Sequence, residues 1–115
     1  MRDYIPINKN NLPELFEIEL AADTFFMEFN YNQTYDFFTV DLYTVDNEPI
    51  ILGEKLVLNV PLWKDSVDQR LPAPSLVVLD ESDNTRRITF DNFMVTTFLY
   101  IDDVAPEEDP EGVTV

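Results

Sequence analysis

Apolar and polar residues alternate with a period of two along most of the chain, which is typical of strands that bury one face. In the stretch ELFEIEL, residues 14–20, every second residue from Phe16 onward is apolar, with glutamates between them. Residues 24–31 repeat the pattern. Because only the short break at residues 21–23 separates the two stretches, they are predicted to pair as a hairpin.

Further extended segments are predicted at residues 37–45, 50–60, 75–80, 86–91 and 93–101. Gly53 lies inside one of them and indicates a β-bulge or a close backbone approach. The polar cluster 81–85 is predicted to form the turn of a further hairpin, which we call the third hairpin, between the segments 75–80 and 86–91. The pattern as a whole predicts an all-β fold, a small antiparallel β-sandwich or partly open barrel of about seven or eight strands.

The last fourteen residues, 102–115, differ in composition from the rest. They contain six acids, two prolines and one glycine, so they cannot bury enough apolar surface to offset the loss of chain entropy. The length of 115 residues suits one domain. We therefore predict a single all-β domain over residues 1–101 and a disordered acidic tail over 102–115.

The charge and the missing residue types limit the function. The chain has 7 Lys and Arg against 23 Asp and Glu, a formal net charge of −16, so it should repel phosphate backbones and anionic lipid surfaces. It contains no Cys and no His, and only two glycines. These absences remove thiolate chemistry, the commonest general base and Gly-rich phosphate loops. We expect no enzyme, no cofactor, no bound metal and no direct nucleic-acid binding.

No apolar run approaches the roughly 20 residues that a membrane-spanning helix needs. The N-terminal residues also lack a basic head followed by an apolar core. We therefore expect no membrane insertion and a protein made in the cytoplasm.

One stretch partly matches a calcium-loop template. Four oxygen-bearing residues stand at its first, third, fifth and twelfth places, namely Asp80, Ser82, Asn84 and Asp91. However, Thr85 replaces the glycine of the sharp turn, and Arg86 stands where a backbone carbonyl would bind the ion. A polar hairpin loop is therefore predicted in place of a cation site.

The least regular stretch is GEKLVLNVPLWKDSVDQRLPAP, residues 53–74, which holds the only tryptophan. In one interpretation Leu62 and Trp63 cap the open end of a sheet, and the prolines keep a crossover from pairing with an edge strand. In the other, the stretch is an exposed contact surface, because Trp and Arg are common interface anchors. The candidate partner interface consists of Trp63, Lys64, Arg70, Leu71, Pro72 and Pro74.

Several segments resemble the small baseplate proteins of contractile-tailed bacteriophages, and in particular the cyanophage baseplate plug family. The resemblance runs in order from Tyr4 to Tyr100 and includes YIPI, FEIEL and FLY. Its most specific pieces are DFFTVDLY at 36–43 and DQRLPAP at 68–74, whereas the acidic tail lies outside it.

This resemblance implies a structural virion protein in the tail baseplate. Such a protein would contact the tube-initiating and hub proteins, without catalysis, and help to close the channel until infection. The symmetry of phage tails makes a homo-oligomer plausible, as a trimer or a hexamer.

Two other function classes stay open. A stand-alone β-sandwich could bind a carbohydrate or a peptide through aromatic residues, the candidates being Phe25, Phe29, Tyr31, Phe37, Phe38 and Tyr43. An enzyme with a carboxylate pair would show a bound metal or a bell-shaped pH-rate profile. Acids adjacent in sequence in a turn or a tail do not supply the fixed separation that such a pair needs.

Overall fold

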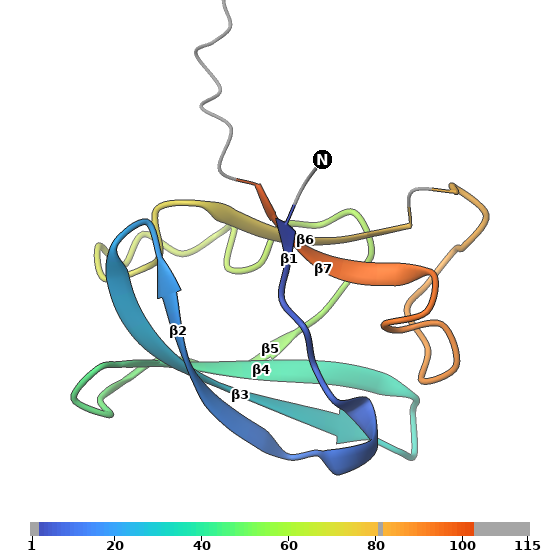
Figure 1. Cartoon of the computed structure of the whole chain (residues 1–115), viewed down its shortest axis with the longest axis horizontal. Helices are drawn as coiled ribbons and strands as arrows, with labels where there is room; N and C mark the ends of the chain where they lie inside the picture. Colours follow the sequence, from blue (N-terminus) through green and yellow to red (C-terminus); the bar gives the residue numbers. More distant parts are fainter. Residues whose placement is uncertain (1–2, 81, 103–115) are drawn as a thin grey trace, which may run out of the picture.

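The structure is a computed structural model that describes residues 3–80 and 82–102. Within them, seven strands form two antiparallel sheets, in the orders β1-β7-β6 and β2-β3-β4-β5 (Figure 1). The elements are β1 (Asp3–Tyr4), the 3-10 helix η1 (Lys9–Asn11), β2 (Glu14–Leu20), β3 (Asp23–Asn32), β4 (Phe37–Thr44), β5 (Pro49–Lys55), β6 (Ser75–Asp80) and β7 (Thr97–Asp102). The predicted all-β sandwich is confirmed, and the sheets do not close into a barrel. The predicted tail lies, apart from Asp102, outside the described residues.

The predicted hairpin of β2 and β3 is confirmed. Leu20 pairs with Asp23, and the two residues between them, Ala21 and Ala22, have positive φ angles of 52° and 72°. Positive φ at both central positions is the geometry that continues the natural twist of a two-residue hairpin.

A row of apolar residues crosses the four-stranded sheet. Phe16 pairs with Met27, Met27 with Leu42, and Leu42 with Ile51. Met27 and Leu42 are fully buried. The period-two pattern therefore places the apolar side of all four strands toward the interior, as alternation across a pleated sheet requires.

Gly53 lies at an irregularity in β5, as the sequence predicts. The register of β4 and β5 shifts between Val40 and Leu42, and Gly53 has a φ of +72°. Its N–H donates to Asp41 Oδ1 at 2.6 Å. A Cβ atom added at Gly53 would meet no atom within 4 Å, so the backbone angle, and not lack of space for a Cβ, favours glycine here.

The predicted third hairpin is wrong. β6 pairs with β7 from Ser75–Asp102 to Asp80–Thr97, and residues 86–91 form turns and irregular structure between them. The physical reason is local: Asn92 Oδ1 accepts from the Thr89 N–H at 2.9 Å, and Asn92 Nδ2 donates to the Arg87 carbonyl at 3.0 Å. Such side-chain bonds to the backbone compete with a strand ladder.

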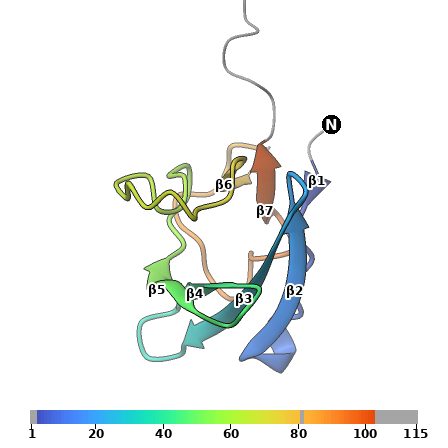
Figure 2. The same ribbon diagram turned by 90° about the vertical axis from the view of Figure 1, so that its left-hand side faces the viewer.

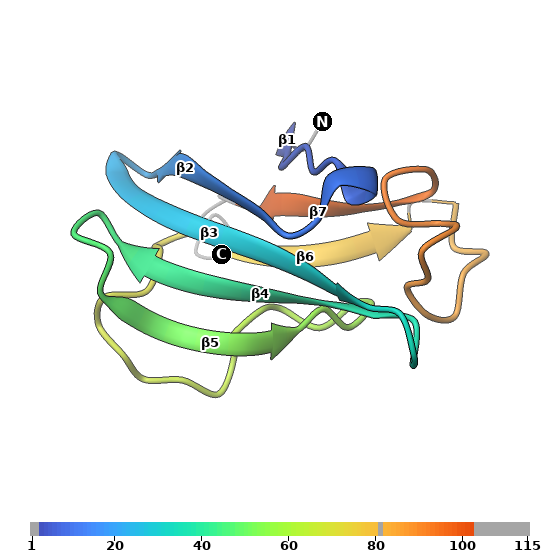
Figure 3. The same ribbon diagram turned by 90° about the horizontal axis from the view of Figure 1, so that it is seen from below.

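The core lies between the two sheets. Figure 2 shows β6 and β7 on one side of the interior and β3 and β4 on the other, and Figure 3 shows the four-stranded sheet in front of β6 and β7. The largest fully buried side chains come from both sheets and from their connections, namely Phe29, Phe38, Phe93, Ile5, Met27, Leu42, Leu76, Leu99, Val40 and Val78. The loop that replaces the predicted hairpin contributes Phe93, whose ring centroid lies 4.5 Å from that of Phe38.

Candidate partner-contact surface

The irregular stretch crosses from β5 to β6 and then follows the outer edge of β6. Leu58 forms a parallel bridge with Val78. The Asn59 N–H donates to the Val78 carbonyl at 2.9 Å, and the Leu62 N–H donates to the Leu76 carbonyl at 2.8 Å. We call residues 56–74 the crossover. It covers a strand edge that would otherwise expose unpaired backbone groups.

Leu62 and Trp63 cap the core, as the first interpretation of this stretch holds. Their side chains are 4% and 8% exposed and belong to the main apolar cluster. The Trp63 N–H donates to Glu54 Oε2 at 2.7 Å, and the Trp63 carbonyl accepts from the Ser66 N–H at 3.0 Å. The expectation that Trp63 is an exposed anchor is therefore corrected, because packing against the interior buries more apolar area than an isolated surface position would.

The other candidate interface residues divide into two groups. Pro72 and Pro74 are buried and Leu71 is half-buried, while Lys64 and Arg70 are exposed. No hydrogen bond or ion pair joins Lys64 to Arg70 within the described part of the chain. The exposed part of the candidate interface is thus two separate cations with a partly accessible leucine. Their role in a contact stays a prediction.

Each of these cations has an acidic neighbour. Arg70 binds Asp68 through its backbone N–H at 2.9 Å, through Nε at 3.1 Å and through Nη2 at 2.8 Å. The hydrogen bonds from Arg70 hold the pKa of the Asp68 carboxyl at about 2. Lys64 Nζ lies 3.4 Å from Asp65 Oδ1, and both side chains are exposed. The bidentate pair fixes the guanidinium of Arg70 in one orientation on the surface.

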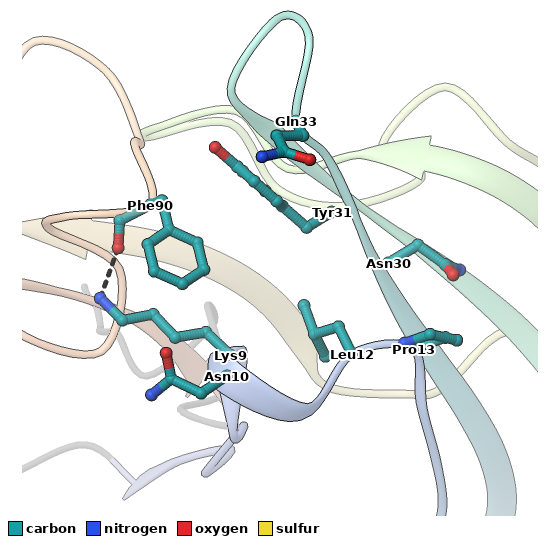
Figure 4. A pocket seen from close by; sticks show the side chains of 8 residues that line it. All are labelled: Lys9, Asn10, Leu12, Pro13, Asn30, Tyr31, Gln33 and Phe90. Carbon is teal, nitrogen blue, oxygen red and sulfur yellow. Dashed lines mark hydrogen bonds between the residues drawn. The ribbon is translucent and has the colours of Figure 1, made fainter.

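A pocket of about 540 Å³ lies between η1, the end of β3 and Phe90 (Figure 4). Lys9 Nζ donates to the Phe90 carbonyl and lies 4.9 Å from the Phe90 ring centroid. Two of the lining residues bind Asp36, whose Oδ1 accepts from the Tyr31 hydroxyl at 2.6 Å and from the Phe90 N–H at 2.9 Å. The hydrogen bond to Asp36 raises the pKa of Tyr31, and the same bond lowers the pKa of Asp36.

A second cluster was missed from the sequence. Lys55, at the end of β5, and Arg86 and Arg87, in the loop between β6 and β7, line one pocket of about 410 Å³. The only sequence signal is the Arg-Arg pair in an otherwise acidic chain. The pairing of β6 with β7, which brings this pair toward Lys55, was not predicted.

The calcium-like loop is a turn closed by its own side chains. Asp80 Oδ1 accepts from the Ser82 N–H at 2.8 Å and from the Ser82 hydroxyl at 2.5 Å, and Asp80 Oδ2 accepts from the Asn84 N–H at 3.3 Å. The bond from the Ser82 hydroxyl is the main reason that the pKa of Asp80 lies at about 2. Across residues 3–80 and 82–102, no three His, Cys, Asp or Glu side chains group as metal ligands would.

Two further expectations concern aromatic residues and membranes. Phe25, Phe29 and Phe38, three of the aromatic candidates for binding a carbohydrate or a peptide, are buried in the core, so these three rings are not open to such a ligand. Among the described residues, no helix has the length and apolar character to span a bilayer.

The fold defines an all-β protein of two antiparallel sheets, with a crossover that lies along the β6 edge and carries the exposed cations Lys64 and Arg70. The chain belongs to the family described as the cyanophage baseplate Pam3 plug gp18, whose model matches residues 2–105. It therefore has a structural role in the phage tail baseplate, in association with other baseplate proteins. No curated protein matches the chain.

Proposed function

We propose that the protein acts as a plug-like component that contacts the tube-initiating and hub proteins of the baseplate and catalyses no reaction. The observation that carries this proposal is the family match over residues 2–105, which includes both sheets and the crossover. A rigid two-sheet body with a covered β6 edge suits a role in assembly, since its remaining surfaces are available for contacts with other subunits.

The exposed side of the crossover is the proposed docking surface for the hub protein. Arg70 is held by Asp68 in one orientation, and a pre-organised arginine loses less conformational entropy on binding. Leu71 beside it is half-buried and packs against the core. A partner would cover the Arg70 fork and Leu71 together, with Lys64 at the rim of the contact.

In the virion this protein would sit in the tail baseplate after synthesis in the host cytoplasm. The rotational symmetry of a tail allows several copies, so a homo-oligomer in the assembled particle is part of the proposal. Residues 1–101 would form the assembling domain, and residues 102–115 would be an acidic extension of it.

The test is co-purification of the full chain with co-expressed hub and tube-initiating proteins. Arg70→Ala and Lys64→Ala should reduce recovery of the complex, while Val95→Ala, which alters an exposed residue of the loop before β7, should not. Equal recovery with all variants would show that the crossover is not the docking surface. If the wild-type chain captures neither protein but binds a glycan, the stand-alone binding module is the better description.

A further inference from the structure

Lys55, Arg86 and Arg87 are three of the seven cations of a chain with a net charge of −16, and all three line one pocket. We call it the cationic pocket. The remaining lining residues are Tyr35, Phe37, Leu56, Val57, Leu58 and Ile88. No carboxylate is among them. Among the described lining residues cations therefore outnumber acids, although Arg87 also pairs with Asp36 beside the pocket.

The lining of the cationic pocket includes buried apolar residues as well as exposed ones. Leu56 and Ile88 are 2% and 4% exposed, whereas Val57 and Tyr35 are 42% and 73% exposed. This combination of an apolar base with a few polar groups at the edge is typical of sites that bind a side chain of another molecule.

The three cations differ in how far they are already engaged. Arg87 donates through Nη1 and Nη2 to the Asp36 carbonyl, both at 3.1 Å, and its Nη2 lies 3.4 Å from Asp36 Oδ2. Lys55 Nζ lies 4.8 Å from the centroid of the Phe37 ring. Arg86 is exposed and makes no hydrogen bond or ion pair with any described residue. Of the three cations, Arg86 therefore has the most N–H donors free to bind an anion from another molecule.

We infer that the cationic pocket binds an acidic peptide segment of a partner protein. A carboxylate of the segment pairs with Arg86 and Lys55, and an apolar side chain of the segment packs on Leu56 and Ile88. Charge complementarity selects this occupant, because Arg86 and Lys55 have no ion pair with a described residue and no described lining residue is an acid, while the chain as a whole is strongly acidic. The identity of the partner as a baseplate protein depends on the proposed function, but the binding itself does not.

Nucleic acid fits these observations less well. Duplex binding draws its affinity from many phosphate contacts spread along the backbone. Here three cations converge on one pocket of about 410 Å³, and the net charge of −16 repels the rest of a duplex. A peptide that presents one carboxylate beside an apolar side chain matches both the size and the lining of the cationic pocket.

The inference is tested with the full chain and a fluorescein-labelled, acetylated hexapeptide of alternating acidic and apolar residues, by fluorescence anisotropy. Arg86→Glu should weaken binding roughly tenfold or more, since a charge-assisted pair becomes a repulsion. Val95→Glu adds an acid at an exposed residue outside the cationic pocket and should leave the affinity nearly unchanged. The same peptide with Asn and Gln in place of its acids should bind at least tenfold more weakly.

Four outcomes would overturn the inference. The first is equal affinity for the neutral peptide, and the second is equal weakening by Arg86→Glu and Val95→Glu. The third is tighter Arg86-dependent binding of a short DNA duplex, and the fourth is peptide binding only after the acids of residues 102–115 are neutralised. The last would mean that the tail of the chain itself takes the place of the partner. If the chain captures the hub protein but does not bind the peptide, only this inference is refuted. If it binds the peptide but does not capture the hub protein, only the proposed function is refuted.

Discussion

Replacing Trp63 with alanine should destabilise the whole domain, because the Trp63 side chain is part of the core and only 8% exposed. A buried aromatic side chain removes about 150–250 Å² from water. At about 25 cal/mol per Å², this corresponds to about 4–6 kcal/mol. Because the unfolded chain already covers part of its apolar surface and the site can partly collapse, we expect a loss of about 3–5 kcal/mol. The positive φ of 44° at position 63 strains tryptophan and alanine alike, so it does not change the difference in the free energy of unfolding between the wild type and the variant.

The measurement is urea unfolding of the full chain, followed by far-UV circular dichroism because the variant lacks the only tryptophan. The midpoint should fall with an unchanged m-value. Val67→Ala is the matched control in the same crossover, since Val67 is 94% exposed, and it should change the free energy of unfolding by less than about 0.5 kcal/mol. In the wild-type chain, Trp63 fluorescence should be blue-shifted and protected from iodide.

A Trp63→Ala variant within about 1 kcal/mol of the wild type, together with ready iodide quenching of Trp63, would refute the core assignment. It would return Trp63 to the candidate interface. If the predicted loss is found, reduced partner capture by this variant cannot be interpreted as a lost contact. For that reason the docking test relies on the exposed residues Arg70 and Lys64.

Three further changes test other parts of the structure. The pKa values of Asp68 and Asp80 are about 2, below the ordinary 3.8, so each carboxylate stabilises the fold above about pH 4, and that contribution is lost as the pH falls toward 2. Melting temperatures in this range should therefore decrease less steeply for Asp80→Asn than for the wild type, and identical slopes would contradict the pKa assignment. Gly53→Ala should cost about 1–2 kcal/mol in urea unfolding because of its φ of +72° alone; an unchanged midpoint would show that this angle relaxes freely. Asp36→Asn should shift the pKa of Tyr31 down toward its ordinary value, since the bond to the carboxylate raises it, and ultraviolet titration of tyrosinate measures this shift; a Tyr31 titration that does not move would show that Asp36 is not the cause.

The four-stranded sheet could be predicted because its strands are local. Each of the segments that became β2, β3 and β4 has an apolar residue at every second position along one face, and short turns join them in chain order. The pairing partners are therefore neighbours in sequence, and a shift of one residue would expose the apolar side of a strand. Gly53 was informative for a similar reason, since glycine inside a strand has few structural explanations.

The second sheet was predictable only in part, because its contacts join distant segments. Residues 86–91 alternate like a strand, but the hydrogen bonds of Asn92 to Thr89 and Arg87 satisfy the backbone locally. Alternation alone cannot distinguish these two outcomes. β1 was missed because it is only two residues long, too short for a period to be recognised.

The burial of Trp63 depends on the same long-range arrangement. The crossover is fixed by hydrogen bonds to β6 that begin at Asn59 and Leu62, and neither residue type indicates such a partner. Once the crossover follows the β6 edge, Leu62 and Trp63 become part of the buried apolar cluster. The sequence therefore left two interpretations, and a tertiary contact selects between them.

The cations show most clearly what the sequence alone could not supply. On the crossover, Arg70 and Lys64 have acids at close positions in the chain, Asp68 and Asp65, so their charges are largely balanced before any partner arrives. Lys55 and Arg86 are far apart in sequence and meet only because the loop before β7 turns toward the end of β5. Among the described residues Arg86 has no acid of its own, so its charge is available to another molecule. In a chain with a net charge of −16, the position of a cation that has no acidic partner is a better guide to where an anionic partner binds than the number of cations is.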